Sequence, residues 1–404
     1  MRRECLVMAK PAGPRCNLRC TYCYYVGKTE LLPADGGLPM DEELLERYIA
    51  GRFAASPGPT THFEWHGGEP TLLGLDYFET IVRLQRRHLP QGRTVGNGLQ
   101  TNGTLIDARW ARFLAREGFS VGLSMDGPAD LHDRYRVGPG GEPSHERAER
   151  AFRLLRDQAV FLNILCVVSR ANVGEPDRVY DYFRELGATH LQFLPLAGRA
   201  AVGGVTEETA GPEAIGAFLC RIFDRWIERD VGRVVIQTFD EALRPIHGVA
   251  HALCVHRETC GDVAVLERDG GFYACDHFVD GEHRLGSLRE RALSELAADP
   301  RMEAFGLAKR DRLPRLCRSC GQLAFCNGGC PKDRFLTTPD GEPGLNYLCA
   351  AYRQLFSHVA PELQRLSAHM KAGKRLREFR PSPASVPGPG AARRDQETGP
   401  RSGS

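Results

Sequence analysis

The chain has 404 residues, a formal net charge of +2, 42% apolar residues and 26% charged residues. This apolar content is enough for a large core, and a near-zero net charge is atypical of a dedicated nucleic-acid-binding protein. The sequence has no uncharged apolar run of roughly 18 residues, so no membrane span is predicted. The first residues also lack the apolar stretch of a signal peptide, and we expect a cytoplasmic protein.

Strand-like and helix-like segments alternate over the first 240 residues. The predicted strands are Leu6–Ala9, Thr61–Trp65, Thr94–Thr101, Ser120–Met125, Phe161–Val168 and His190–Leu196. The predicted helices are Asp41–Phe53, Leu75–His88, Asp107–Glu117, Ser144–Gln158, Glu175–Leu186 and Pro212–Arg229. Six such βα units predict an α/β fold with a parallel sheet, either a partial barrel or an open doubly wound sheet. In both architectures, ligands bind at the carboxyl ends of the strands.

A short strand, Val234–Phe239, is expected to close this first domain, residues 1–240. The βα rhythm then stops, and residues 241–370 form a cysteine-rich domain that we expect to rely on bound metal, with a helix at Tyr352–Met370. Residues 371–404 are rich in Pro, Gly, Ser and Arg and are predicted to be a disordered basic tail.

The fourteen cysteines are mostly clustered. In a protein without secretion signals, such clusters indicate metal binding or redox chemistry rather than disulfides. Cys16, Cys20 and Cys23 follow the first predicted strand with C-x3-C-x2-C spacing. Three thiolates can hold three irons of a [4Fe–4S] cluster and leave the fourth iron open for a small ligand, as catalytic sites do. A three-thiolate zinc site is the alternative.

This spacing, with Tyr22 before the last cysteine, resembles the radical S-adenosylmethionine (SAM) superfamily. The resemblance implies a partial (β/α)6 barrel. It also implies that Gly67-Gly68-Glu69-Pro70, after the second strand, receives the SAM amino group. Exposed glycine carbonyls and the Glu69 carboxylate would both attract an ammonium.

Further positions match groups that contact SAM in this superfamily. Ser124 and Asp126 end the fourth strand, where the family contacts ribose or carboxylate. Arg136 could pair with the SAM carboxylate through its planar guanidinium. Leu194, at the end of the sixth strand, matches a position that offers backbone to adenine.

The second cysteine region resembles the SPASM extension of radical SAM enzymes that modify peptides and proteins. The pattern contains seven cysteines, and Cys254 would be an eighth ligand. The family partition assigns Cys254, Cys260, Cys275 and Cys330 to one auxiliary cluster and Cys317, Cys320, Cys326 and Cys349 to the other. With the first cluster, this gives three [4Fe–4S] clusters. Two four-cysteine zinc ribbons would suit the spacing almost as well.

A narrower resemblance rests on four stretches of the chain. They are Glu64-Trp65-His66-Gly67-Gly68-Glu69-Pro70-Thr71-Leu72, Leu99-Gln100-Thr101-Asn102-Gly103-Thr104-Leu105, Val235-Ile236-Gln237-Thr238-Phe239-Asp240 and Cys275-Asp276-His277-Phe278-Val279. Together they are similar to the anaerobic sulfatase-maturating enzymes, over roughly residues 10–355. This implies oxidation of a Cys or Ser side chain in a sulfatase to Cα-formylglycine, after a 5′-deoxyadenosyl radical removes hydrogen from Cβ.

The resemblance also implies roles for single residues. The reaction needs a base near an electron acceptor, and Asp276, next to the predicted ligand Cys275, is the expected catalytic base. Tyr25, His66 and Gln100 are expected to line the substrate end. His66 stands where the family usually has Gln, so its length and titration differ.

The expected partners are an unfolded or nascent sulfatase polypeptide and an electron donor such as ferredoxin or flavodoxin. The alternative function is a SPASM maturase that makes a thioether or carbon–carbon crosslink in a ribosomal peptide. Only fifteen residues precede Cys16, which disfavours the N-terminal peptide-recognition domain common in such enzymes. A non-catalytic iron–sulfur or zinc scaffold is a third possibility.

Overall fold

The computed structural model describes residues 5–25, 28 and 38–382. Strands and helices alternate in its first part, as the sequence predicts. The strands are β1 (Leu6–Lys10), β2 (Thr60–Trp65), β3 (Thr94–Thr101), β4 (Phe119–Ser124), β5 (Phe161–Val168), β6 (His190–Pro195) and β7 (Val235–Ile236). The helices are α1 (Glu42–Ala55), α2 (Gly74–His88), α3 (Ala108–Arg116), α4 (Ala129–His132), α5 (His145–Asp157), α6 (Pro176–Leu186), α7 (Pro212–Arg229) and α8 (Gln237–His247).

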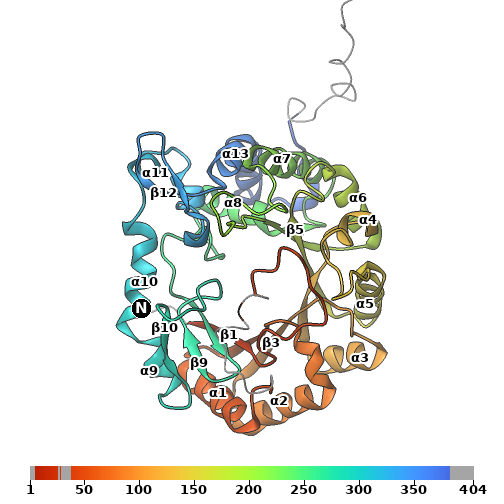
Figure 1. The fold of residues 1–404 in the computed structure, drawn as a ribbon. Helices are drawn as coiled ribbons and strands as arrows, with labels where there is room; N and C mark the ends of the chain where they lie inside the picture. Colours follow the sequence, from red (N-terminus) through yellow and green to blue (C-terminus); the bar gives the residue numbers. More distant parts are fainter. Residues whose placement is uncertain (1–4, 26–27, 29–37, 383–404) are drawn as a thin grey trace, which may run out of the picture.

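The strands form one curved sheet with the helices on its outside (Figure 1). Its order is β10 (Arg284–Ser287), β9 (Gly271–Tyr273), β8 (Val263–Glu267) and then β1-β2-β3-β4-β5-β6-β7, and β1 to β7 run parallel. Burial alternates along β4, where Phe119, Val121 and Leu123 are buried and the residues between them are partly exposed. One face of the sheet therefore packs against the helices and forms the hydrophobic core. The other face borders the interior of the barrel, where polar groups can lie. This is the predicted partial barrel.

Local signals in the sequence set the helix ends. Asp107 caps α3, since its carboxylate accepts hydrogen bonds from the backbone N–H groups of Arg109 and Trp110, both at 2.9 Å. Such a cap stabilises a helix by about 1 kcal/mol. Gly118 then ends the helix with a φ of +67°, a conformation that favours glycine.

The predicted strand Val234–Phe239 is wrong beyond its first residues. Only Val235–Ile236 pairs with β6, and α8 begins at Gln237. The β-branched run suggested a longer strand, but Phe239 and Ala242 are both buried at a three-residue spacing that suits a helix face.

The cysteine-rich part adds three more strands to the same sheet. These are β8 (Val263–Glu267), β9 (Gly271–Tyr273) and β10 (Arg284–Ser287), and β8 pairs in parallel with β1. The remaining elements are α9 (Leu293–Ala297), α10 (Pro300–Asp311), α11 (Arg315–Arg318), α12 (Leu323–Cys326), β11 (Leu336–Thr337), β12 (Pro343–Leu345), α13 (Cys349–Lys371) and the 3₁₀ helices η2 (Pro70–Leu73), η3 (Pro331–Asp333) and η4 (Leu376–Glu378). The sheet thus crosses residue 240, the predicted domain boundary.

Helix α13 confirms the predicted helix at Tyr352–Met370 and packs along α7 and α8. It shares one hydrophobic core with the barrel helices. None of the helices in the described ranges is long and apolar enough to cross a membrane.

The chain remains packed after α13, which differs from the prediction of a disordered tail from residue 371. Phe379 is only 7% exposed, and Arg377 donates a hydrogen bond to the Gly232 carbonyl. One aromatic side chain and a few hydrogen bonds hold this segment, which has no apolar periodicity for sequence analysis to find. Residues 383–404 of the predicted tail lie outside the described part.

Candidate functional site

Cys16, Cys20 and Cys23 belong to the loop after β1. The dark red segment that follows β1 runs on the inner side of the curved sheet (Figure 1). Backbone hydrogen bonds fasten this loop across the barrel to the segment after β4, from Arg19 N to Val137 O at 2.8 Å and from Thr21 N to Tyr135 O at 3.0 Å. Burial raises the pKa of Cys16 to about 11, and the negative charges of Glu69, Cys20 and Cys23 add to the effect. Three partly buried thiols close enough to repel one another suit a shared cationic metal group.

The Gly67-Gly68-Glu69 turn after β2 packs directly on this loop. Gly68 N donates to Gly13 O and Glu69 N to Arg15 O, both at 2.8 Å. A Cβ atom on Gly68 would lie 2.1 Å from the Arg15 carbonyl oxygen, so only glycine fits.

The Glu69 carboxylate fastens this turn to the end of β3. Its Oε1 accepts hydrogen bonds from the Thr71 N–H and the hydroxyls of Thr71 and Thr101, at 3.0, 2.6 and 2.8 Å. Its Oε2 accepts one from Asn102 N at 2.7 Å. Oε2 is thus the oxygen with room for a further donor, such as the expected ammonium.

Asp126 and Arg136, both predicted SAM contacts, meet at Tyr22 of the cysteine loop. The Tyr22 hydroxyl donates to Asp126 Oδ2, and Arg136 donates to the Tyr22 oxygen at 2.9 Å. Arg136 is only 7% exposed, and its buried Nε has no hydrogen-bond partner in the described residues. A buried guanidinium nitrogen without a partner is costly unless a ligand supplies an acceptor.

Other predicted contacts lie at the same end of the sheet. Gln100 Nε2 donates to Ser124 Oγ at 3.1 Å, which joins the ends of β3 and β4. Leu194 pairs with Val167 near the end of β6. Of the predicted SAM and substrate residues, Gly67-Gly68-Glu69, Gln100, Ser124 and Leu194 thus lie at or near the carboxyl ends of β2, β3, β4 and β6.

Asp276 follows β9 and is held by two groups from the first part of the chain. Lys10 Nζ forms an ion pair with Oδ1, and the Tyr24 hydroxyl donates to Oδ2. Burial would raise the pKa of Asp276, but the Lys10 ammonium paired with it holds this pKa well below its usual range. The Asp276 carboxylate is thus paired with a cation through one oxygen and hydrogen-bonded by a hydroxyl through the other.

His66 is a neutral hydrogen-bond donor beside this carboxylate. Its Nδ1 accepts the Gly67 N–H at 2.7 Å, which places the ring proton on Nε2. Burial lowers the pKa of His66. Neutral imidazole can donate one N–H, as the amide of the family's usual Gln can, so the substitution preserves that function.

Of the two adjacent tyrosines, Tyr24 rather than Tyr25 contacts Asp276. Tyr25 is 3% exposed, and its hydroxyl lies 2.6 Å from both carboxylate oxygens of Glu267. Tyr24 is 45% exposed. Sequence reasoning named Tyr25 for the substrate end and missed both Tyr24 and Lys10. The only signal was two tyrosines in succession, which does not show which ring turns inward.

The mutual electrostatic interactions of the eight downstream thiols fall within the two predicted sets of four, although no group of three or more His, Cys, Asp or Glu side chains in the described residues is close enough to hold a metal ion. In the first set, the Cys275 thiol interacts electrostatically with Cys330 and Cys254, and Cys260 interacts with Cys254 and Cys330. In the second set, Cys317 interacts with Cys320, Cys326 and Cys349. The four thiols of the second set line one cavity of about 280 Å³. Each set matches the four thiolates that a cubane cluster takes.

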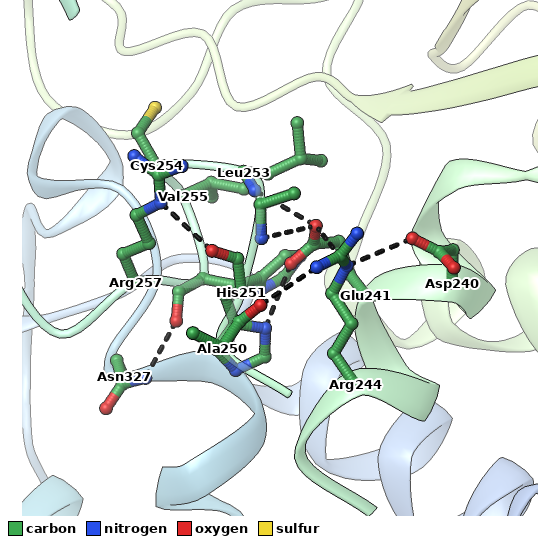
Figure 2. Close-up of polar contacts among 12 residues, drawn as sticks. Asp240, Glu241, Arg244, Ala250, His251, Leu253, Cys254, Val255, Arg257 and Asn327 are labelled. Carbon is green, nitrogen blue, oxygen red and sulfur yellow. Dashed lines mark hydrogen bonds and ion pairs between the residues drawn. The ribbon is translucent and has the colours of Figure 1, made fainter. Parts of the chain in front are cut away.

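The loop that carries Cys254 is held by the buried side chain of Glu241 (Figure 2). The Glu241 carboxylate accepts hydrogen bonds from the backbone N–H groups of Ala252 and Leu253, at 2.9 and 3.0 Å, and contacts His251 Nδ1 at 2.9 Å. His251 Nε2 donates to the Ala324 carbonyl at 2.9 Å, in the helix that ends at Cys326. Glu241 and His251 thus tie the two cysteine sets together.

We expect Glu241→Ala to loosen this loop and lower the iron content of the anaerobically purified protein. The two backbone N–H groups would lose their acceptor, at a cost of about 1–3 kcal/mol. Iron per chain and the unfolding temperature measure the effect. Asp240→Ala is the matched control, because Asp240 is half exposed and contacts Arg244 at the surface. Equal iron in both variants and the wild type would contradict the prediction.

Two family models match the chain. One is described as the radical SAM superfamily and matches residues 11–191. The other, SPASM, is described as an iron–sulfur cluster-binding domain and matches residues 255–321. The matches cover the first cysteine loop and part of the second cysteine region.

Curated relatives match over nearly the whole chain. The serine-type anaerobic sulfatase-maturating enzyme of Bacteroides thetaiotaomicron is 39% identical over 370 residues, 88% of this chain and 89% of that protein. The cysteine-type enzyme of Clostridium perfringens is 34% identical over 371 residues, 90% of this chain and 99% of that protein.

Solved structures have the same fold. The structure described as native anSMEcpe with bound AdoMet and Cp18Cys peptide matches with a TM-score of 0.82 at 34% identity, over 91% of this chain and all of that chain. SuiB of Streptococcus suis, bound to S-adenosylmethionine, matches with a TM-score of 0.57 at 16% identity, a likeness of fold alone.

Proposed function

The chain belongs to the anaerobic sulfatase-maturating enzymes of the radical SAM superfamily, and from this we propose that it oxidises a Cys or Ser side chain of a sulfatase to Cα-formylglycine. The observation that carries the proposal is the contact between Tyr24 and Asp276. Tyr24 adjoins Cys23 and Asp276 adjoins Cys275, so an ionised carboxylate lies between the first cysteine loop and an auxiliary set. This is the arrangement that a base next to an electron acceptor requires.

The residues present fit the family's cofactors, SAM and [4Fe–4S] clusters. Cys16, Cys20 and Cys23 would hold the first cluster, and the two sets of four thiols would hold two auxiliary clusters. The unpartnered Nε of Arg136 suits the SAM carboxylate, and Glu69 Oε2 suits its amino group. When bound, these cofactors supply the radical that removes hydrogen from the target Cβ and the acceptor for the electron released afterwards.

The chain's own side chains would handle the target residue and its proton. The target thiol or hydroxyl would lie against Asp276 Oδ2, and the ionised carboxylate would take its proton as the carbon is oxidised. His66 would donate its Nε2–H toward the substrate, and Gln100 would line the same end. Asp276 is the catalytic residue of this scheme.

Further expectations concern partners and location. The substrate would be an unfolded or nascent sulfatase segment, since the target side chain must reach a site inside the ring of strands. An electron donor such as ferredoxin or flavodoxin would reduce the first cluster. A reducing compartment such as the cytoplasm suits a chain in whose described residues none of the fourteen cysteines forms a disulfide.

The test incubates the anaerobically reconstituted protein with reductant, SAM and a sulfatase peptide that carries Cys-x-Pro-x-Arg, or Ser in place of Cys. We expect an aldehyde at the target residue, detected by mass spectrometry and by hydrazide labelling. A peptide with Ala at the target position is the control and should stay unmodified. A thioether or carbon–carbon crosslink without aldehyde would favour the peptide-maturase alternative.

A further inference from the structure

Lys10, the last residue of β1, is a fully buried cation between two carboxylates. Its side chain has no exposed surface, and neither has that of Glu267. The Lys10 ammonium forms an ion pair with Asp276 Oδ1 and lies 3.8 Å from Glu267 Oε1. It also lies 3.6 Å from the centre of the Tyr25 ring. A buried ammonium is costly unless paired, so this surrounding fixes its position closely.

The two carboxylates that face Lys10 differ in their other contacts. Both oxygens of Glu267 are engaged by the Tyr25 hydroxyl, and burial raises the pKa of Glu267 to about 7. Asp276 is 15% exposed and contacts the half-exposed Tyr24. Glu267 and Tyr25 therefore form the buried support of the lysine, and Asp276 is the more exposed of its two carboxylate partners.

Lys10 also determines how the Asp276 carboxylate is turned. A carboxylate on a short side chain can rotate about its last bond, which exchanges its two oxygens. With Oδ1 paired to Lys10, Oδ2 is the oxygen that accepts the hydrogen bond of the half-exposed Tyr24. Without the ammonium, nothing among the described hydrogen bonds or ion pairs of Oδ1 would hold this orientation.

We propose that Lys10 is a positioning residue that holds Oδ1 of Asp276 so that Oδ2 faces the target side chain. The inference rests on the proposed role of Asp276 as base. It assigns Lys10 to the rate of product formation and not to SAM cleavage, because its contacts are with Asp276, Glu267 and the tyrosines rather than with the first cysteine loop's thiols.

The experiment uses Lys10→Met, which keeps the length of the side chain and removes its charge. We expect kcat for formylglycine formation to fall by about 10²-fold, the scale of a misplaced catalytic group, with little change in the KM for the peptide. Cleavage of SAM to 5′-deoxyadenosine should continue, so more deoxyadenosine forms per aldehyde. Lys10→Arg, which keeps the ion pair, should recover most of the loss. An equal loss in both variants would overturn the proposal.

Two further variants separate positioning from a general structural role. In an Asp276→Asn background, Lys10→Met should cause no further loss of product, since the group it positions is gone. An undiminished second loss would overturn the proposal. Glu267→Gln is the matched control: it removes the other carboxylate beside Lys10 and should cost much less product than Lys10→Met. An equal cost would show that Lys10 serves Glu267 instead.

Iron content and aldehyde formation by the wild type are measured in the same series. Absence of aldehyde from the wild type would refute the proposed function. Normal aldehyde formation by both the wild type and Lys10→Met would refute the role of Lys10 alone. If Lys10→Met loses iron, the rates of aldehyde formation by Lys10→Arg and Glu267→Gln are compared instead. If Glu267→Gln has full iron and forms aldehyde more slowly than Lys10→Arg, positioning through Asp276 is contradicted. If Glu267→Gln forms aldehyde faster than Lys10→Arg, positioning is supported.

Discussion

Replacement of Cys16, Cys20 and Cys23 together by Ala is expected to abolish SAM cleavage and to leave two clusters in the protein. The eight downstream thiols gather into two separate sets, so they need none of the first three. Iron should fall from about twelve to about eight atoms per chain. Anaerobic iron analysis and chromatography of 5′-deoxyadenosine measure the two effects.

The control for this variant is Cys220→Ala, which removes a buried thiol that belongs to none of the three groups. It should keep the iron content and SAM cleavage of the wild type. Retained deoxyadenosine formation by the triple variant would contradict the assignment of the first cysteine loop. Loss of all iron would contradict the independence of the two auxiliary sets.

Asp276→Asn is expected to separate SAM cleavage from product formation. Asn nearly matches the shape of Asp but cannot take a proton, and loss of a general base costs about 10²–10⁴-fold. Formylglycine formation should fall by that factor, whereas 5′-deoxyadenosine should still form. Both products are quantified in single incubations with the sulfatase peptide.

Asp280→Asn is the matched control, because Asp280 is a partly exposed carboxylate four residues further on that contacts His283. It should turn over the peptide at the wild-type rate. Wild-type product formation by Asp276→Asn would place the base elsewhere, with His277 as the next candidate.

The sequence predicts most of the first part of the fold. Residues Thr94–Thr101 and Phe161–Val168 match β3 and β5 at both ends. The second range is rich in apolar and β-branched residues, which favour a strand. The strand predicted at Val234–Phe239 was wrong because strand propensity depends only on neighbours along the chain. Phe239 instead lies in a helix, where it packs against the distant residues Phe223 and Trp226. The strands β8–β10 were missed because they are short and lie between cysteines that dominate the local pattern.

The parts of the candidate site that depend on the spacing of residues in the sequence could be predicted. The cysteine motifs and the Asp276 position follow from spacing and resemblance, and the thiols of each predicted set interact electrostatically with one another. Lys10 and Tyr24 could not be found that way. A lysine at the end of an apolar strand gives no sign of its partner, and Asp276 lies more than 250 residues along the chain from Tyr24. Only the pairing of β8 with β1 brings these segments side by side.

The most direct test of hydrogen removal from Cβ uses a sulfatase peptide whose target residue carries deuterium at Cβ. After incubation with the reduced protein and SAM, mass spectrometry reads both products. The account predicts deuterium in 5′-deoxyadenosine and an aldehyde at the same residue, since the radical takes hydrogen from Cβ before Asp276 takes the proton. Deoxyadenosine without deuterium, formed together with a modified peptide, would contradict it.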